Sequence, residues 1–405
     1  METKNALNVR PDSEFSVEEY QSALESITWT HENLSSVKQY IDHIIDLPYG
    51  RSAAKPLIDH AIGVCESHLG DLGSSSIDVL SYLLGKLSPL VVQFLEQDLR
   101  IRNIIASYFE ASDENLQAAQ TLLEGMNSDR RSISDLVRFE TYIRVVRNYL
   151  ECDRTELAQS VLSRAALCRG NLENIPPESE IHFILSQARI LDTNRKFLDA
   201  SVKYYGVSRE HLVSESDRYT CLRQAIICAI LSPAGPARSQ QLRRLYIDEG
   251  ALQDQVLFAI LKKVYLDRLL SQDDVDVLQK SLSSHQLVVV EDGITVLQRA
   301  VIDHNVLSVS KVYDNISLDV LARTLGLDPS RAEAYTAHMI SQKRLHAKID
   351  QVDHLVYFDD IGTNQSGPSK ELVLRDQSVL RMCSQLEDIV SLIQKKHPDL
   401  DAFVL

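Results

Sequence analysis

Apolar residues between Ile294 and Asp360 recur first at the spacing of a helix. Seven residues fall at three- and four-residue steps, which places them on one helical face: Val296, Leu297, Ala300, Val301, His304, Leu307 and Val312. The short β-branched stretch Asn315–Ser317 does not extend that helix, and Ser317 is a good cap for a second helix over Leu318–Leu325. Gly326 ends this helix, and Pro329 in a first turn opens a third one. The pattern predicts three packed helices.

After Arg344 the apolar period falls from roughly 3.6 residues to two. Leu345, Ala347 and Ile349 alternate with polar neighbours, a turn follows at residues 350–353, and Leu355–Phe358 is a second apolar run. Such a pattern is typical of a β-hairpin. Helix, short strand, helix–turn–helix and hairpin together predict a winged helix.

The middle of the chain carries a repeat with steps of 40 and 42 residues, in which an alanine precedes a large apolar residue by four positions. The pairs are Ala118 and Leu122, Ala158 and Leu162, and Ala200 and Tyr204. Apolar helices precede them at 101–109, 142–150 and 183–191. In two-helix repeats a small residue lets neighbouring helices approach while the large one fills the groove. We therefore expect a right-handed α-solenoid of TPR/HEAT-like helical repeats, with about five to seven helix pairs.

Helical patterns continue on both sides of this repeat. Before residue 99 they are less regular, with one face containing Trp29 and another at 80–87, separated by a Gly- and Ser-rich loop at 70–76. After it, helices are predicted at 219–231, 238–249, 253–270 and 271–282, and the third of these counts Leu266 and Leu269 among its apolar residues. The predicted domains are a helical-repeat array at 1–285 and the winged helix at 286–360, which we expect to pack rigidly together.

A further helix is expected beyond the winged helix. Residues 361–369 are polar and turn-rich, which predicts a flexible joint, and residues 370–397 show an amphipathic helical pattern. Its apolar stripe includes Val379, Leu386, Ile389, Val390 and Ile393. A stripe of this kind either folds back on its own domain or docks in a helix bundle with partner subunits. The predicted fold class is thus mainly α-helical, ending in a C-terminal helix.

Charge narrows the possible partners. The chain has a net charge of −15, and residues 294–360 contain seven Lys and Arg against nine Asp and Glu. A winged helix is first suspected of binding DNA, but a nucleic-acid reader needs cations to neutralise phosphates. The sequence therefore argues against nucleic acid and anionic membranes as partners. It also lacks the apolar core of a signal peptide and any run long enough to span a membrane, so we expect an intracellular protein.

Motifs for catalysis, cofactors and metals are absent from the sequence. The six cysteines and twelve histidines are dispersed, without the spacing of a zinc site, and phosphate-binding glycine loops and nucleophile elbows do not occur. Four histidines fall in the predicted winged helix: His304, His338, His346 and His354. Without an accompanying nucleophile, we interpret them as partly buried or rim residues. We predict a protein that is not an enzyme and binds no cofactor or metal.

Order and motifs together resemble the PCI-domain family, which occurs in the proteasome lid, the COP9 signalosome and translation initiation factor 3. Within it, the chain most closely resembles the family of signalosome subunit 4. The similar stretches are residues 140–150, residues 188–197, Tyr265-Leu-Asp-Arg268, residues 300–316 and Ile349-Asp-Gln-Val-Asp353. The resemblance covers roughly residues 99–360, and the winged helix is its most specific part.

The resemblance implies a non-catalytic scaffold subunit of the complex that removes Nedd8 from cullin-RING ubiquitin ligases. Its partners would be other signalosome subunits of the PCI and MPN classes, with the cullin-RING ligase as substrate of the complex, in cytoplasm and nucleus. In that family winged helices pair edge to edge, terminal helices form a common bundle, the zinc-dependent isopeptidase is another subunit, and the amino-terminal repeats of subunit 4 face the substrate.

Two surfaces are the candidates for subunit assembly. The hairpin offers an unpaired strand edge, and the terminal stripe offers an amphipathic helix. The interface candidates are Leu345, Ile349, Val356, Phe358, Val379, Leu386, Ile389, Val390 and Ile393. The alternatives are a PCI subunit of the proteasome lid or of an initiation-factor complex and, from another class, a winged-helix nucleic-acid-binding protein, which the acidic charge disfavours.

Overall fold

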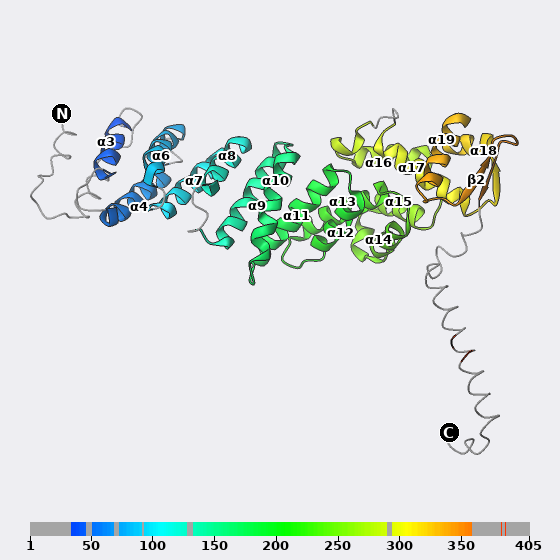
Figure 1. Ribbon diagram of the computed structural model, residues 1–405, viewed down its shortest axis with the longest axis horizontal. Coiled ribbons are helices and arrows are strands. Elements are labelled where there is room, and N and C mark those ends of the chain that lie inside the picture. The colour runs from blue at the N-terminus through cyan, green and yellow to red at the C-terminus, as the bar shows by residue number, and fades with distance from the viewer. Residues whose placement is uncertain are drawn as a thin grey trace, which may run out of the picture. The chain divides into compact units, whose positions relative to one another are not determined.

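A computed structural model describes residues 34–45, 51–68, 73–90, 93–127, 133–289 and 294–358, together with Met382 and Gln385. The chain divides into two compact units, one up to Ile190 and one from Leu191 onward. Each is described by itself, with the labels of Figure 1. The predicted domain limits at residues 285 and 360 are a separate division, by type of element, and stay a prediction.

The first unit is built from helices, coloured blue to green in Figure 1. They are α3 (Leu34–Ile45), α4 (Arg51–Ser67), α6 (Ser74–Leu87), the 3-10 turn η1 (Ser88–Leu90), α7 (Leu95–Ala111), α8 (Asn115–Asn127), α9 (Asp135–Glu151), α10 (Thr155–Gly170) and most of α11 (Pro177–Thr193). Tyr40, Leu57 and Leu80 belong to a core shared by α3, α4, α6 and α7. A second core begins at Ala106 and continues to Ile190. Trp29 lies outside the described residues, and α6 begins inside the predicted loop at 70–76.

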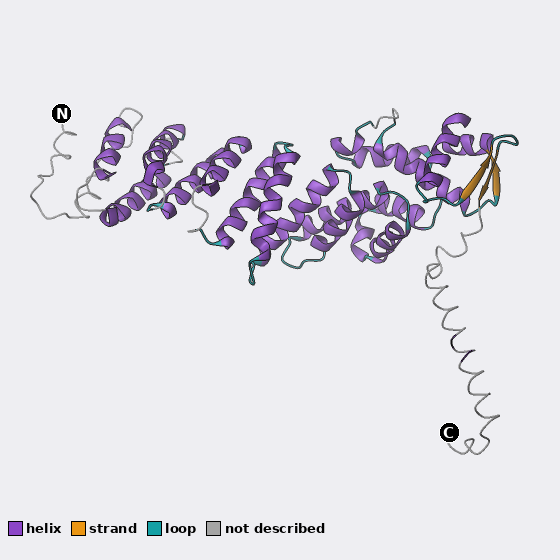
Figure 2. Cartoon of the chain, viewed as in Figure 1, coloured by secondary structure: helices purple, strands orange, loops and turns teal. Residues whose placement is uncertain are grey.

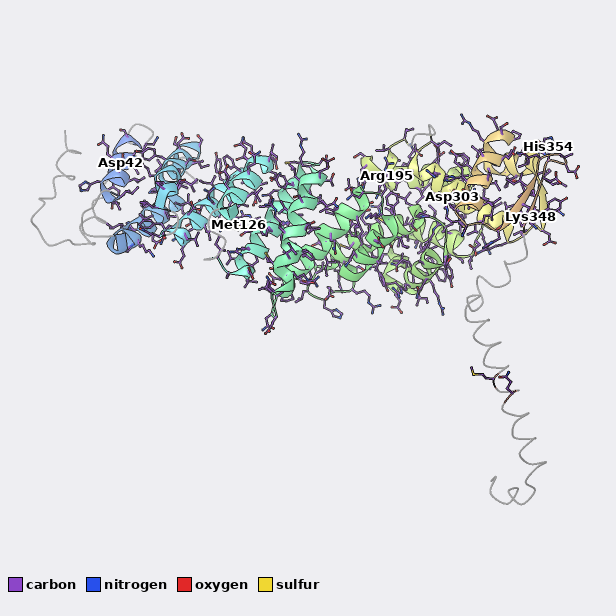
Figure 3. All side chains as sticks on the ribbon, viewed as in Figure 1. Asp42, Met126, Arg195, Asp303, Lys348 and His354 are labelled. Carbon is purple, nitrogen blue, oxygen red and sulfur yellow. The ribbon has the colours of Figure 1, made fainter. Side chains whose placement is uncertain are left out.

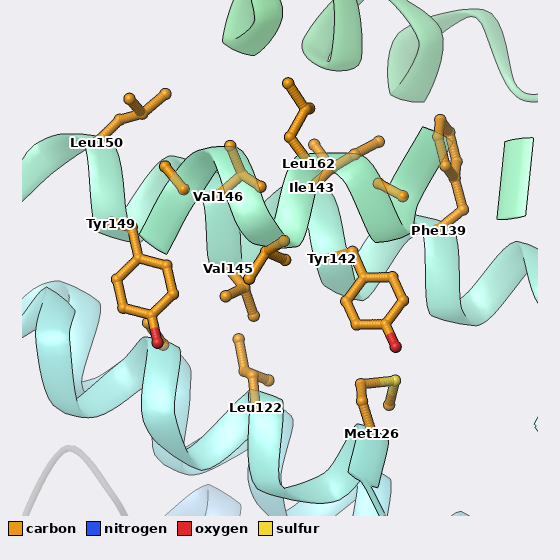
Figure 4. Packing of buried hydrophobic residues seen from close by; sticks show 14 of the residues in the cluster. Leu122, Met126, Phe139, Tyr142, Ile143, Val145, Val146, Tyr149, Leu150 and Leu162 are labelled. Atoms are coloured by element: carbon orange, nitrogen blue, oxygen red, sulfur yellow. The ribbon is translucent and has the colours of Figure 1, made fainter. Parts of the chain in front are cut away.

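The predicted alanine repeat is confirmed in the packing. Ala118, Ala158 and Ala200 are completely buried and lie on α8, α10 and α12, the second helix of each predicted pair. Figure 4 shows how Leu122 and Met126 of α8 point toward Tyr142 and Val145 of α9 in the first unit. A methyl group at each repeat position lets the backbones approach, so larger side chains on either side fill the space between helices.

The turn inside each pair repeats as well. Asp113, Asp153 and Arg195 adopt positive φ angles of 60°, 56° and 61°, and they follow one another at the same 40- and 42-residue steps. In each turn the residue after the positive φ donates its N–H to the carbonyl five positions earlier, as Arg154 does to Tyr149 at 2.9 Å. This is the left-handed termination that usually employs glycine. The repeat is therefore present in the backbone conformation, although none of the three positions is a glycine.

An acidic residue near the end of the first helix of each pair joins successive repeats. Glu110 accepts hydrogen bonds from Arg144 at 2.8 and 2.9 Å and from Asn148 at 2.8 Å. Glu151, 41 residues later, accepts from Arg189 at 2.8 Å. These bonds give the first unit a regular connection between the first helices of successive pairs, in addition to its apolar core.

The second unit begins with further helices and ends with the winged helix. Its helical part comprises α12 (Phe197–Ser208), α13 (Glu215–Leu231), α14 (Pro236–Ile247), η2 (Glu249–Gln253), α15 (Gln255–Tyr265), α16 (Gln272–Ser281) and η3 (Ser284–Leu287). Side-chain caps set many of these helix starts. Ser271 and Asp274 form a reciprocal capping box for α16, and Asp254 accepts from the N–H of Leu257 at 3.1 Å.

The winged helix contains α17 (Val296–Ser310), β1 (Asn315–Ser317), α18 (Leu318–Leu325), α19 (Pro329–Ser341), β2 (Ala347–Asp350) and β3 (Leu355–Phe358). Figure 2 shows the small sheet beside its helices. The strands are antiparallel in the order β1-β3-β2. Ser317 caps α18, Gly326 ends it at φ 67°, and Pro329 opens α19, as the sequence predicts. Helical repeats followed by a winged helix are thus confirmed.

Three apolar residues do not lie where the pattern placed them. Leu266 and Leu269 are 43% and 47% exposed, because α15 ends at Tyr265 and Asp267 turns the chain at φ 52°. Val312 is 73% exposed because α17 ends at Ser310. The predicted joint at 361–369 lies outside the described residues, as does the helix at 370–397 except for Met382 and Gln385.

Candidate assembly site

The four interface candidates on the hairpin are part of the module's own core. Leu345, Val356 and Phe358 are buried, and Ile349 packs against the same cluster. Period-two alternation sends these apolar side chains inward, toward α17 and α18, so a partner strand could meet only their backbone. The other candidates, Val379, Leu386, Ile389, Val390 and Ile393, lie outside the described residues.

The open edge of the hairpin is β2. Phe358 donates its N–H to the carbonyl of Asp314 at 2.8 Å, so alternate residues of β3 bond toward β1. The backbone N–H and C=O groups of the residues between them point toward β2, where Tyr357 is opposite Lys348. The backbone groups of Ala347 and Ile349 therefore point away from β3. Within the described part of the chain no strand pairs with this side, whereas β3 is central and offers no edge.

Two exposed apolar side chains of the wing were not selected from the sequence. Tyr357 is 40% exposed on the outer face, opposite Asn315 on one side and Lys348 on the other. Val352 is 88% exposed in the turn between β2 and β3. Tyr357 alternates with two buried neighbours, Val356 and Phe358, so period-two alternation already places its side chain on the outer face.

Helix α17 and the residue after it, Lys311, hold the turn that follows α15 through four contacts. His304 Nε2 lies 2.9 Å from the carbonyl oxygen of Arg268. Asn305 bonds the backbone of Leu270 twice, accepting from its N–H at 2.9 Å and donating to its carbonyl at 3.2 Å. Lys311 pairs with Asp267 at 2.6 Å. Two of the sequence stretches that carry the family resemblance, 265–268 and 300–316, are therefore direct partners in space.

Two arginines complete this contact region, which we call the α17 joint (Arg238, Asp267, Arg268, Asp303, His304, Asn305, Lys311 and Arg344). Arg344 pairs with Asp303 at 2.7 Å, which ties the end of α19 to α17. Figure 3 marks the position of Asp303. Arg238 is buried and donates to the carbonyls of Ala229 and Ile230 at 3.1 and 2.8 Å, at the last turn of α13. Burial lowers the pKa of Arg238 to about 10, and it remains charged at neutral pH.

His304 is the most perturbed histidine of the joint. It is almost completely buried, and burial together with the charge of Arg238 lowers its pKa to about 4. The neutral ring donates to Arg268 and cannot serve as a charged group at physiological pH. The sequence placed the histidines of this module at its rim or partly inside it. The structure puts His304 in the interior, while His338, His346 and His354 are exposed, with His354 at the end of the wing (Figure 3).

A buried carboxylate links the repeats of the second unit to the segment before the winged helix. Asp192 follows Glu151 by 41 residues and accepts from Gln286 at 3.0 Å through both carboxylate oxygens. Gln286 belongs to η3, and the two residues are 94 positions apart. His285 Nε2 also lies 3.2 Å from Asp192. In the two preceding repeats an arginine or asparagine of the next pair donates to the acidic residue. For Asp192 the donor is Gln286 of η3 instead.

The third helix of the winged helix is hydrogen-bonded to the wing. Its Glu333 accepts from Gln351 at 2.6 Å. Among the residues that the structure describes, no three histidine, cysteine, aspartate or glutamate side chains are grouped to hold a metal ion. No helix in the described ranges is both long and apolar enough to cross a membrane.

Family models match most of the described chain. Residues 261–360 match the PCI domain, and residues 32–216 match the model described as PSMD12/CSN4, N-terminal. The first match starts in α15 and includes the sheet and all of the α17 joint except Arg238. The second corrects the extent of the resemblance, which from the sequence began near residue 99.

Full-length relatives give the same result. The chain is 38% identical over 368 residues to COP9 signalosome complex subunit 4 of Emericella nidulans, covering 88% of each protein. It is 33% identical to the subunit of that name from Arabidopsis thaliana over 95% of this chain and 96% of the relative. For Drosophila melanogaster the identity is 32% over 82% and 80%. The chain therefore belongs to the family of COP9 signalosome complex subunit 4, within the PCI-domain proteins.

Proposed function

We propose that the protein is a scaffold subunit of a COP9 signalosome and has no catalytic residues of its own. The observation that carries this proposal is the likeness to subunit 4 over nearly the whole chain. The architecture agrees with it, because helical repeats and a winged helix provide surfaces for partners. The partners are the other PCI and MPN subunits, and the complex acts on cullin-RING ligases by removing Nedd8, in cytoplasm and nucleus.

Assembly would use backbone pairing at β2. Ala347 and Ile349 present hydrogen-bonding groups to a neighbouring winged helix, and a strand edge of this kind joins another sheet readily. The amino-terminal repeats would face the cullin-RING substrate, and the helix predicted at 370–397 would enter a shared bundle. Domain limits at residues 285 and 360 are part of the same proposal.

The edge can be tested with Ala347→Pro. Proline removes an N–H that points away from β3, so the sheet should stay folded while pairing with a partner strand is lost. We expect the tagged full-length variant to bring down fewer signalosome subunits, and less cullin deneddylation activity, than the wild type. Thermal unfolding of the purified chain should change little. Unchanged recovery of all subunits would remove β2 from the assembly surface.

The terminal helix has its own test. Replacing Leu386 and Ile393 together by glutamate places charges in the predicted apolar stripe. We expect the purified chain to keep its helical circular dichroism and to lose incorporation into the complex. Replacing Ser384 and Gln394, polar positions near the same residues, by glutamate is the matched control. Equal co-purification of both variants would refute a docking role for the stripe.

The wild-type pull-down also distinguishes the remaining families. Recovery of signalosome subunits with a deneddylation activity that a zinc chelator abolishes supports the proposal. Recovery of proteasome-lid or initiation-factor subunits would support another PCI complex. A strong, salt-dependent affinity for duplex DNA or RNA would favour the nucleic-acid alternative, against the acidic charge of the chain.

A further inference from the structure

Four exposed apolar residues of the second unit lie on two short segments that the α17 joint holds together. One segment is the turn after α15, and the other directly follows α17. The ion pair of Asp267 with Lys311 at 2.6 Å joins the two segments. We call the four residues, which are between 43% and 73% exposed, the turn patch (Leu266, Leu269, Val312 and Tyr313). Neighbouring exposed apolar residues, unlike single ones, mark an interaction surface.

The chain leaves the winged helix beside this patch. Phe358, at the end of β3, donates its N–H to the carbonyl of Asp314 at 2.8 Å, and Asp314 directly follows Tyr313. The segment after Phe358 therefore starts next to the turn patch. Residues 359–369, which include the predicted joint, can span at most roughly 40 Å. The helix predicted at 370–397 is thus tethered within reach of the patch.

The stripe of that helix is an apolar surface of the same kind. From Val379 to Ile393 it spans about 21 Å of helix. Met382 lies seven residues before Ile389, which places it on the stripe, and it is 56% exposed. The chain therefore carries two apolar surfaces that are open to water, and contact between them would remove both from water.

We propose that the turn patch is the docking site of the chain's own C-terminal stripe in the isolated protein. The tether selects this occupant over a second copy of the chain. A short flexible connection holds its two ends at a millimolar effective concentration, about a thousandfold above a micromolar concentration of other copies in solution. The stripe of the same molecule therefore occupies the patch first.

This contact and the shared bundle proposed above exclude one another, because each buries the same face of the same helix. In the isolated chain the stripe covers the turn patch, and entry of the helix into a bundle would expose the patch again. The docking itself does not rest on the signalosome assignment, since it involves only this chain.

Chemical cross-linking of the isolated full-length chain tests the docking. Cys383 lies within the stripe, and Val312→Cys places a second thiol in the turn patch. A short bismaleimide should join these two cysteines within one molecule, at a rate that does not depend on protein concentration. Peptide mass spectrometry identifies the joined residues.

Val352→Cys is the matched control for position. Val352 is 88% exposed in the turn at the other end of β3 from Phe358, where a freely moving tail would still reach it. We expect its cross-link to Cys383 to form at least about tenfold more slowly than that of Val312→Cys, because a docked stripe concentrates the thiol at one place only.

Replacements on both surfaces connect the cross-link to the contact. In the Val312→Cys chain, Leu386→Glu with Ile393→Glu should slow the reaction about tenfold, whereas Gln377→Glu with Ser391→Glu, on the opposite side of the predicted helix, should leave it within about twofold. Leu266→Asp should also slow it. Only the stripe variant should in addition lose incorporation into the complex, because Leu266 is not part of the stripe. Circular dichroism establishes that each variant is folded.

Three results would overturn the inference. They are equal cross-linking rates for Val312→Cys and Val352→Cys, cross-links that form mainly between two molecules, and an unchanged rate in the stripe variant. Failure of the signalosome pull-down would leave these measurements unaffected, because they require only the isolated chain.

Discussion

Replacing Arg238 with methionine is expected to lower the free energy of unfolding of the second unit by about 3 kcal/mol. The side chain is buried, and its guanidinium donates to the carbonyls of Ala229 and Ile230 at the end of α13. Hydrogen bonds from a charged group are worth about 1.5–3 kcal/mol each. Methionine keeps much of the volume, which offsets part of the loss, but leaves the carbonyl of Ile230 without this donor.

Thermal unfolding of the full chain measures the loss, and hydrogen–deuterium exchange of α13 and α17 locates it. Arg243→Met is the matched control, since Arg243 lies on the same helix but is exposed, and a change within about 0.5 kcal/mol is expected there. Arg238→Lys should fall between the two, because an ammonium cannot reproduce the planar fork of a guanidinium. Equal stability of Arg238→Met and Arg243→Met would show that the buried arginine contributes nothing net.

Acidification is expected to destabilise the winged helix through His304. Its pKa is near 6.5 in the unfolded chain and about 4 in the fold, where burial and the charge of Arg238 oppose protonation. Between these values the unfolded state binds more protons than the folded state, so stability falls as pH drops from about 6.5. The contribution of His304 is lost in full below about pH 4. Each unit of difference between the two pKa values is worth about 1.4 kcal/mol, so the loss of unfolding free energy is about 3 kcal/mol.

The measurement compares unfolding free energies of wild type and His304→Gln at pH 7 and pH 4.5. Glutamine can donate to the carbonyl of Arg268 without titrating, so the variant should lose less stability on acidification. The pH dependence of His304→Gln is subtracted from that of the wild type because other groups titrate too. Burial raises the pKa of Asp274, but its bond to Lys263 lowers it further, and the stability that Asp274 contributes is also lost as pH falls. His346→Gln, at an exposed histidine of the module, is the matched control for the substitution itself. Parallel curves for wild type and His304→Gln would contradict the assignment.

Both predictions concern a region that the sequence marked only indirectly. The stretches 265–268 and 300–316 drew attention as family signatures, and neither contains a recognisable chemical motif. The structure explains them as two sides of one contact, in which His304 and Asn305 hold backbone atoms 36 and 35 residues away. Because polar side chains bond backbone groups whose positions are set by the fold, such a contact leaves no periodic pattern.

Likewise, the assembly candidates were only partly visible. The hairpin was predicted from alternation, and Leu345, Val356 and Phe358 were chosen because they are apolar. Strand β1 also pairs with β3, which makes β3 central and leaves β2 as the open edge of the hairpin. The candidates on the hairpin thus support the module from inside, while the surface of the wing is made by Tyr357, Lys348 and Val352.

The sequence by itself determined the elements whose cause is local. The bounds of α18 follow from Ser317 and Gly326, the start of α19 from Pro329, and the repeat of buried alanines from side-chain volume at fixed steps. Only the tertiary structure decided which apolar residues remain in water, which strand is an edge and which charges are buried. Those properties depend on neighbours distant in sequence, as Asp192 and Gln286 show across 94 residues, and burial changes the cost of a charge or an unpaired backbone group only once those neighbours are in place.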